Sequence, residues 1–230
     1  MTKTVAVVLA GGTGSRVGGP VPKQFVPLGE REVIEYSIDT FCNHPSVDEV
    51  AVVVHREWRA HFEALATRRG WSKVAAVLDG GAERWQSSLA AVRHYEVQGE
   101  VRLMLHDAAR PWVSAETVTR VVEALESHAA VAVAVPATDT LFRVEGDRIA
   151  EIPPRSLYYH AQTPQAFRVE VLADAYRSAL QDSAFCATDD CGVLLRYRPD
   201  VPIHIVEGTP ENTKITFPKD IDNLCKNRSL

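Results

Sequence analysis

The chain has 230 residues, of which 46% are hydrophobic and 24% charged, and its formal net charge is −5. This length suits one α/β domain, and the acidic balance argues against a general nucleic-acid-binding surface. No apolar run approaches the roughly 20 residues that a membrane-spanning helix needs, and the N-terminal segment lacks the apolar core and cleavage site of a signal peptide. We therefore expect a cytoplasmic protein that binds neither nucleic acid nor membranes.

Apolar runs alternate with segments of helical periodicity over the first part of the chain. The runs predict strands at 5–10, 47–54, 74–78, 101–111 (ending in a polar cluster) and 129–137. The periodic segments predict helices at 32–41, 56–70, 83–95 and 114–128. Near-continuous apolar strands that alternate with helices predict a mostly parallel sheet with helices on both faces.

The pattern changes at residue 139. Residues 139–155, "DTLFRVEGDRIAEIPPR", predict two short strands joined by the turn "EGDR". An isolated hairpin is marginal in water, so we expect this arm to pack on a second subunit. After it the sequence predicts helices at 170–180 and 188–197, a strand at 202–208 and a closing helix at 217–227. We treat residues 1–230 as a single domain with an arm at about 138–158.

Three polar clusters follow predicted strands. They are the glycine-rich loop at 10–23, "DGG" at 79–81 and "HDAARP" at 106–111. In open sheets of this kind, ligands bind at the carboxyl ends of the strands. The three clusters are therefore expected to meet at one binding site.

The glycine-rich loop is typical of phosphate binding, because backbone N–H groups can approach phosphate closely there. It departs from a dinucleotide fingerprint, since Val17 stands where the third glycine belongs, and from a P-loop, since Pro20 follows Gly19 in place of lysine. What remains is G-x-G-x-R followed by P-K, the pattern of nucleotidyltransferases that make sugar nucleotides. In it Arg16 and Lys23 would neutralise charge on the α-phosphate and on departing pyrophosphate. Read singly, Lys23 would be a solvated surface charge.

The cluster "HDAARP" supplies a candidate metal ligand. Asp107 lies just past a buried strand, and Mg²⁺ is usually held by one or two carboxylates plus substrate phosphates. Arg110 could face an anionic substrate. Taken alone, Asp107 could equally stabilise a loop, and Arg110 could equally form an ion pair at the surface. We expect His106 to be a structural hydrogen-bonding residue, because a phosphomonoester nucleophile, with its second pKa near ~6, needs no general base at pH 7.

Several stretches together carry a resemblance that spans the chain from about Val5 to Ile221. They are "AGGTGSR", "PKQF.PLG..EVIEYSI..F", "GG.ERWQSSLAAV", "HDAARPWV", "DTL", "HAQTPQAF", "TDD" and "VEGTPENTKITFPKDI". The chain resembles the 2-C-methyl-D-erythritol 4-phosphate cytidylyltransferases and their relatives, the D-ribitol 5-phosphate cytidylyltransferases. The resemblance implies a Rossmann-like nucleotidyltransferase fold, a β-arm that builds a homodimer, and dependence on CTP and Mg²⁺. It implies attack of a polyol phosphate on the α-phosphorus of CTP.

The resemblance also implies roles for residues at matching positions. Transition-state stabilisation would fall to Arg16 and Lys23, and positioning of the substrate phosphate to Arg155 and Lys214. Contacts with CTP would come from Ala10, Gly11, Gly12, Gly81, Ser87 and Ala108, with Ser87 near the cytosine. The polyol phosphate would be bound by Asp107, Arg110, Thr140 and Thr163, with Asp107 also at the metal. Because Thr140 and Arg155 lie on the predicted arm, they would reach the partner subunit's site. Without the resemblance, Arg155, Lys214 and Ser87 would read as ordinary surface or helix residues.

The polyol is less clearly indicated than the nucleotide. "HDAARP" and "HAQTPQ" resemble the methylerythritol branch. Three features resemble the ribitol branch instead, namely Gly11, the segment "IPPRSLYY" and Cys191. At the position of Cys191, the ribitol branch often has Cys and the methylerythritol branch usually has Ala. We favour methylerythritol phosphate and retain ribitol 5-phosphate as the alternative.

Two further functions compete with this reading. One is a catalytically inactive nucleotide-binding regulator or structural dimer. The joint presence of Arg16, Lys23, Asp107, Arg155 and Lys214 argues against it. The other is a uridylyl- or guanylyltransferase acting on a sugar phosphate, which would share the glycine loop but not "HDAARP" and "TPQ".

Overall fold

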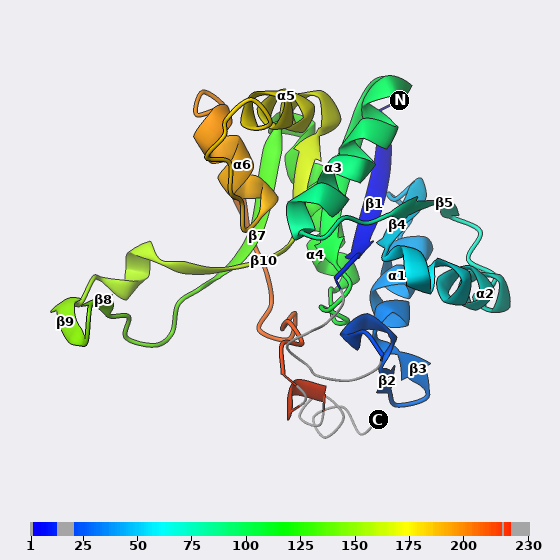
Figure 1. Ribbon diagram of the computed structural model, residues 1–230, viewed down its shortest axis with the longest axis horizontal. Coiled ribbons are helices and arrows are strands. Elements are labelled where there is room, and N and C mark those ends of the chain that lie inside the picture. Colours follow the sequence, from blue (N-terminus) through cyan, green and yellow to red (C-terminus); the bar gives the residue numbers. More distant parts are fainter. Residues whose placement is uncertain (1, 13–20, 218, 222–230) are drawn as a thin grey trace.

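The computed structural model describes residues 2–12, 21–217 and 219–221. Its centre is a seven-stranded sheet in the order β11-β7-β10-β6-β1-β4-β5. Figure 1 shows this sheet with helices packed around it. The strands of this sheet are β1 (Lys3–Ala10), β4 (Glu49–Val54), β5 (Val74–Asp79), β6 (Val101–Asp107), β7 (Ala130–Pro136), β10 (Tyr159–Arg168) and β11 (His204–Glu207). Two small hairpins lie outside it, formed by β2 (Pro27–Leu28) with β3 (Arg31–Glu32) and by β8 (Arg143–Glu145) with β9 (Arg148–Glu151).

The predicted sheet is confirmed as mostly parallel. Its neighbours β1/β4, β1/β6, β4/β5 and β7/β11 run parallel, and β10 is antiparallel to both β6 and β7. The helices are α1 (Val33–Asn43), α2 (Arg59–Arg69), α3 (Arg84–Tyr95), α4 (Ala115–Ser127), α5 (Val169–Ala179) and α6 (Asp190–Tyr197). These bounds agree with the predicted segments, and the N-cap at Ser114 and the left-handed C-cap at Gly70 both form.

The alternation of strand side chains divides the core into two layers. In β1, Ala6 and Val8 face a cluster that includes side chains of α1, α2 and α4, whereas Val5 and Val7 face one that includes side chains of α3, α5 and α6. All four β1 residues are completely buried. Helices on both faces are what a parallel sheet requires, because both of its faces are apolar.

Strand β10 is the element that hydrophobic patterning missed. Its central residues Gln162, Thr163 and Gln165 are polar, yet each is 5% exposed or less. Proline within the run also argues against a strand from sequence. These polar side chains are buried because each has hydrogen-bond partners, such as the Thr209 carbonyl for Gln162 and the Asp189 carboxylate for Gln165.

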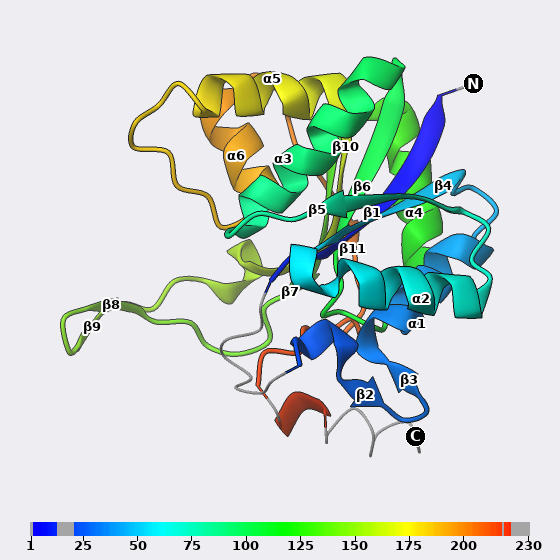
Figure 2. The same ribbon diagram turned by 45° about the vertical axis from the view of Figure 1, so that its right-hand side comes forward.

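The predicted arm is present. Strands β8 and β9 form a hairpin whose turn contains Gly146 with φ +63, and Figures 1 and 2 show it projecting away from the sheet. Every residue of both strands is exposed. Of the predicted closing helix at 217–227, the structure describes residues 219–221 as helical and Phe217 as a bend; residues 218 and 222–227 lie outside the described residues.

Candidate active site at the carboxyl ends of the strands

Strand register brings the three polar clusters to one edge of the sheet. Ala10 pairs with Val54, Val54 with Asp79, and Leu9 with Asp107, so β1, β4, β5 and β6 all end at the same level. The expectation that the clusters meet is therefore confirmed for the described residues. Arg16 lies outside the described residues, as does most of the glycine-rich loop.

The loops that follow β1 and β5 are in contact at Gly11 and Gly80. A Cβ added to Gly80 would lie 2.8 Å from the Gly11 Cα, so this backbone contact leaves no room for a side chain. A Cβ added to Gly11 would lie 2.5 Å from the Ser87 Oγ, which also accepts a hydrogen bond from the Gly81 N–H at 3.3 Å. The predicted nucleotide residues Gly11, Gly81 and Ser87 therefore form one small surface.

Gln24 fixes the beginning of the glycine-rich loop. Its Nε2 donates to the carbonyls of Ala10 (2.7 Å) and Gly12 (2.9 Å), and its side chain is buried. Sequence analysis did not single it out, although it stands directly after Lys23 in "PKQF". The sequence offered no signal for this role, because the burial of Gln24 is visible only in the structure.

Asp107 lies between two cations. Its Oδ1 accepts from the Arg84 Nε at 2.9 Å, and its Oδ2 accepts from the Lys214 Nζ at 2.6 Å. Burial alone would raise the pKa of the Asp107 carboxyl, but Arg84 and Lys214 outweigh burial and hold that pKa far below its usual range. The carboxylate is therefore anionic at all physiological pH values. Sequence analysis paired neither Arg84 nor Lys214 with Asp107.

His106 has the structural role expected of it. Its Nε2 donates to the Arg110 carbonyl at 2.9 Å, and its Nδ1 accepts from the Thr163 hydroxyl at 3.0 Å. The same Thr163 oxygen accepts from the Asp107 N–H at 3.1 Å. Burial lowers the pKa of His106 to about 4, so the ring is neutral at pH 7. This chain of bonds fixes the backbone at Asp107. As a direct substrate ligand, Thr163 stays a prediction.

The segment 209–217 crosses the site and carries Lys214. Arg110 donates to the carbonyls of Asn212 (2.7 Å) and Ala161 (3.0 Å), and the Lys23 Nζ donates to the Ile215 carbonyl at 2.8 Å. The Ile215 N–H in turn donates to the Ala109 carbonyl at 2.8 Å. Lys23 and Arg110, which are far apart in sequence, thereby both bond to the segment whose Lys214 reaches Asp107.

Thr140 and Arg155 are not part of this cluster. Both are exposed at the base of the arm, and the Arg155 Nη1 donates to the Thr138 carbonyl at 2.8 Å, which ties the two sides of the arm together. Their predicted reach into a partner's site stays a prediction.

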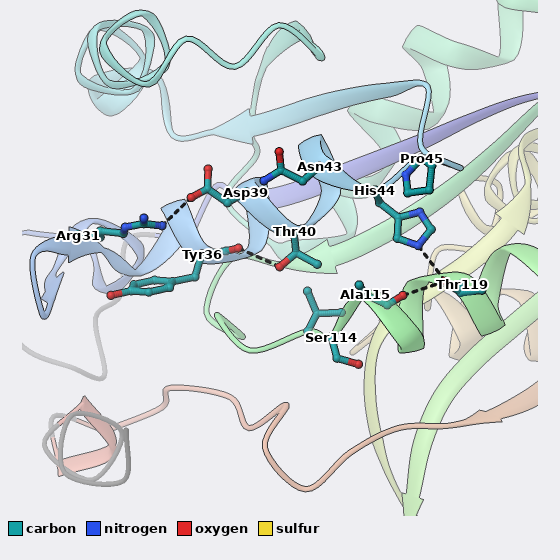
Figure 3. Close-up of a pocket in the computed structure, with 11 residues that line it drawn as sticks. Arg31, Tyr36, Asp39, Thr40, Asn43, His44, Pro45, Ser114, Ala115 and Thr119 are labelled. Atoms are coloured by element: carbon teal, nitrogen blue, oxygen red, sulfur yellow. Dashed lines mark hydrogen bonds and ion pairs between the residues drawn. The ribbon is translucent and has the colours of Figure 1, made fainter. Parts of the chain in front are cut away.

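A surface pocket of about 690 Å³ between α1 and the start of α4 contains none of the predicted site residues (Figure 3). Its polar groups bond to one another, as Arg31 does to Asp39 at 2.6 Å and His44 to Thr119 at 2.9 Å. The candidate active site is therefore the strand edge around Asp107 rather than this pocket.

The model of the 2-C-methyl-D-erythritol 4-phosphate cytidylyltransferase family matches residues 4–224. The chain belongs to this family. It is accordingly a nucleotidyltransferase, and the resemblance seen in its motifs is confirmed. Among the described residues, no helix has the length and apolar character to span a membrane.

Named relatives include proteins whose names give either of the two polyols. The chain is 43% identical to a 2-C-methyl-D-erythritol 4-phosphate cytidylyltransferase of Thermobifida fusca, over 95% of this chain and 90% of that protein. It is 36% identical to the bifunctional ribulose 5-phosphate reductase/CDP-ribitol pyrophosphorylase Bcs1 of Haemophilus influenzae, over 99% of this chain and 49% of that protein. Its fold matches the crystal structure of 4-diphosphocytidyl-2C-methyl-D-erythritol synthase from Anaerococcus prevotii with a TM-score of 0.88 at 24% identity, covering 100% of this chain and 97% of that one.

The donor set of this cytidylyltransferase fits a magnesium ion bound together with the nucleotide. The described residues contain no group of three or more His, Cys, Asp or Glu side chains arranged to hold a metal. Asp107 nevertheless offers a carboxylate with about four lone-pair sites, of which Arg84 and Lys214 use two. Because Mg²⁺ commonly binds one or two carboxylates plus substrate phosphates, Asp107 can serve as its protein ligand.

Proposed function

We propose that the protein transfers the cytidylyl group of CTP to 2-C-methyl-D-erythritol 4-phosphate, giving 4-diphosphocytidyl-2-C-methyl-D-erythritol and pyrophosphate in isoprenoid precursor synthesis. The observation that carries this proposal is that the segment 209–217 brings Lys214 to Asp107 and accepts a hydrogen bond from Lys23, within a chain of the matching family. One anionic and two cationic groups at the ends of the parallel strands suit a triphosphate and a phosphomonoester that react together.

The reaction needs little proton chemistry from the protein. A phosphate oxygen of the polyol phosphate attacks the α-phosphorus of CTP, a new P–O bond forms, and the bond to the bridging oxygen of pyrophosphate breaks. The attacking phosphate is largely ionised at pH 7, since its second pKa is near ~6. Neutral, doubly hydrogen-bonded His106 is consistent with the absence of a general base. Catalysis would rest on position and charge.

Different cationic side chains would bind different phosphate groups. Lys23, with Arg16 in the glycine loop, would stabilise negative charge on the α-phosphate and on the departing pyrophosphate. Lys214 and Arg155 would position the phosphate of the polyol. Arg110 and Asp107, with Thr140 and Thr163, would bind the polyol phosphate. Asp107 would also hold Mg²⁺, which when bound neutralises phosphate charge.

The nucleotide would lie against the two loops that meet at glycine. Ala10, Gly11, Gly12 and Ala108 would contact CTP from the β1 and β6 ends, and Gly81 from the β5 end. The Ser87 hydroxyl, placed between Gly11 and Gly81, would lie near the cytosine.

We further propose a homodimer in which the arm at about 138–158 completes the partner's site. The support is a set of large apolar side chains along and beside the arm that are 44% to 75% exposed: Phe142, Val144, Ile149, Ile152, Leu157, Tyr158 and Tyr159. Exposed apolar side chains on this scale mark an interaction surface. The rest of the chain would act as one catalytic domain in the cytoplasm, where nucleoside triphosphates are available.

The test is pyrophosphate release by the purified protein with CTP and Mg²⁺, in parallel with 2-C-methyl-D-erythritol 4-phosphate and D-ribitol 5-phosphate. We expect a clear preference for the first. A preference for the second would overturn the choice of polyol, and it would make Gly11 and Cys191 informative. Replacing CTP by UTP or GTP should abolish most turnover; equal rates with UTP would refute the cytidylyl assignment.

A further inference from the structure

Arg84 lies within the motif "GG.ERWQSSLAAV" but has no role in the proposed function. It is the first residue of α3, directly after the loop that carries Gly81. Its Nε donates to Asp107, and its Nη1 donates to the Asp190 Oδ2 at 2.5 Å. One guanidinium thus joins the carboxylate of the candidate active site to a second carboxylate on α6.

Asp190 is a rigid anchor for this arginine. Its side chain is completely buried at the start of α6. The Tyr176 hydroxyl donates to its Oδ1 at 2.6 Å, and its own N–H donates to the Gln165 Oε1 at 3.0 Å. With Asp190 held from α5 and β10, Arg84 is fixed on the side away from Asp107.

The two cations on Asp107 differ in how firmly they are held. The Arg84 side chain is 21% exposed and braced by Asp190, whereas the Lys214 side chain is 36% exposed and lies on the segment 209–217. Lys214 is also the residue that the proposed function assigns to the substrate phosphate. When Lys214 turns to that phosphate, Asp107 would lose one partner, and a buried carboxylate without any partner is strongly unfavourable.

We propose that Arg84 is a positioning residue that keeps the Asp107 carboxylate in place while Lys214 exchanges from Asp107 to the phosphate of the incoming substrate. This inference rests on the proposed function. Two carboxylates and two cations balance in the cluster formed by Arg84, Asp107, Asp190 and Lys214. After the exchange, Arg84 is still bonded to Asp107 and still defines its orientation.

The role needs arginine rather than a cation of any kind. A guanidinium presents several donors in a rigid plane and can bond to two carboxylates at once, whereas a lysine ammonium is a single point charge on a flexible stem. Arg84→Lys therefore keeps the positive charge but cannot bond to Asp107 and Asp190 at the same time. Arg84→Gln removes the charge as well.

The matched control is Arg69→Lys. Arg69 also joins two carboxylates, with its Nε 2.7 Å from the buried Glu35 and its Nη2 3.4 Å from Asp39, and its side chain is similarly exposed at 27%. It braces α2 against α1 and contacts no predicted site residue among those described. Arg84→Lys and Arg69→Lys should therefore lower the melting temperature by similar amounts. Arg69→Lys then shows what the loss of a two-carboxylate bridge does to stability without a change at the candidate active site.

The experiment measures steady-state pyrophosphate release, circular dichroism and melting temperature for wild type, Arg84→Lys, Arg84→Gln and Arg69→Lys. We expect Arg84→Lys to lower kcat/KM for the polyol phosphate roughly 10- to 100-fold, with a much smaller change in KM for CTP, and Arg84→Gln to lower it further. Arg69→Lys should leave kcat and both KM values unchanged. In an Asp107→Asn background, the effect of Arg84→Lys should largely disappear, because both changes act through one carboxylate.

The outcomes separate the two proposals. A folded Arg84→Lys enzyme with wild-type kinetics, or one whose effect is undiminished in the Asp107→Asn background, would overturn the role of Arg84 and leave the proposed function intact. If Arg84→Gln does not fold, Arg84→Lys carries the test. Turnover of neither polyol phosphate by the wild type would overturn the proposed function and, with it, the exchange.

Discussion

Replacing Gln24 by alanine should loosen the glycine-rich loop at its first residues. The Gln24 Nε2 is the donor to two carbonyls, those of Ala10 and Gly12, and Ala10 is buried while Gly12 is exposed. Each hydrogen bond contributes about 1 kcal/mol net, and depriving the buried Ala10 carbonyl of this donor costs about 1–3 kcal/mol. Water can replace Gln24 at Gly12. The free energy of unfolding should therefore fall by roughly 2–4 kcal/mol.

The assay combines urea unfolding, thermal unfolding and steady-state kinetics. For a domain of this size the loss corresponds to a melting temperature lower by roughly 4–16 °C. Because Ala10 and Gly12 are predicted nucleotide contacts, KM for CTP should rise while KM for the polyol phosphate changes less. Gln98→Ala is the matched control, since the exposed Gln98 also donates to a carbonyl, that of His94, at 3.3 Å on the surface.

The reasoning fails if Gln24→Ala and Gln98→Ala are equally stable. A loss below about 0.5 kcal/mol, the range of ordinary surface substitutions, would mean that the two hydrogen bonds do not hold the loop. An unchanged KM for CTP in a destabilised variant would separate loop stability from nucleotide binding.

Three further results are expected. Lys23→Ala should leave a folded dimer and lower kcat/KM roughly 100- to 1000-fold, as loss of one transition-state donor does; near-normal kcat/KM would remove Lys23 from the mechanism. Deleting residues 141–152 should give an inactive monomer in light scattering and turnover assays, and an active monomer would contradict the dimeric site. Because burial lowers the pKa of His106 from 6.5 to about 4, the unfolded chain binds the extra proton between these values, so stability should fall by roughly 2–3 kcal/mol as the pH drops from 6.5 to 4. His106→Asn should remove most of this slope, leaving the contributions of His44, whose pKa burial also lowers, and of carboxylates such as Asp107, whose pKa lies below its usual range; an unchanged slope would show that His106 does not titrate as a buried group.

The alternation of apolar strands and amphipathic helices was enough to predict the sheet, its helices and the arm. Such patterns report local periodicity, and in this chain the core positions follow it closely, as Val5 to Val8 in β1 illustrate. Strand β10 was not predicted from hydrophobic patterning because its buried face is polar. Gln162, Thr163 and Gln165 are buried only because partners on remote segments satisfy them, and no local window contains those partners.

For the candidate active site as well, local sequence patterns and tertiary structure determined different features. Residue types and spacing sufficed to single out the glycine loop, Lys23 and Asp107, since phosphate chemistry needs close backbone approach, cations and a carboxylate. Only the tertiary structure decided that Asp107 is held by Arg84 and Lys214, 23 and 107 residues away in sequence. Pairings over such distances depend on strand order and register, which bring the ends of β1, β5 and β6 together, and the sequence motifs carry no record of that geometry.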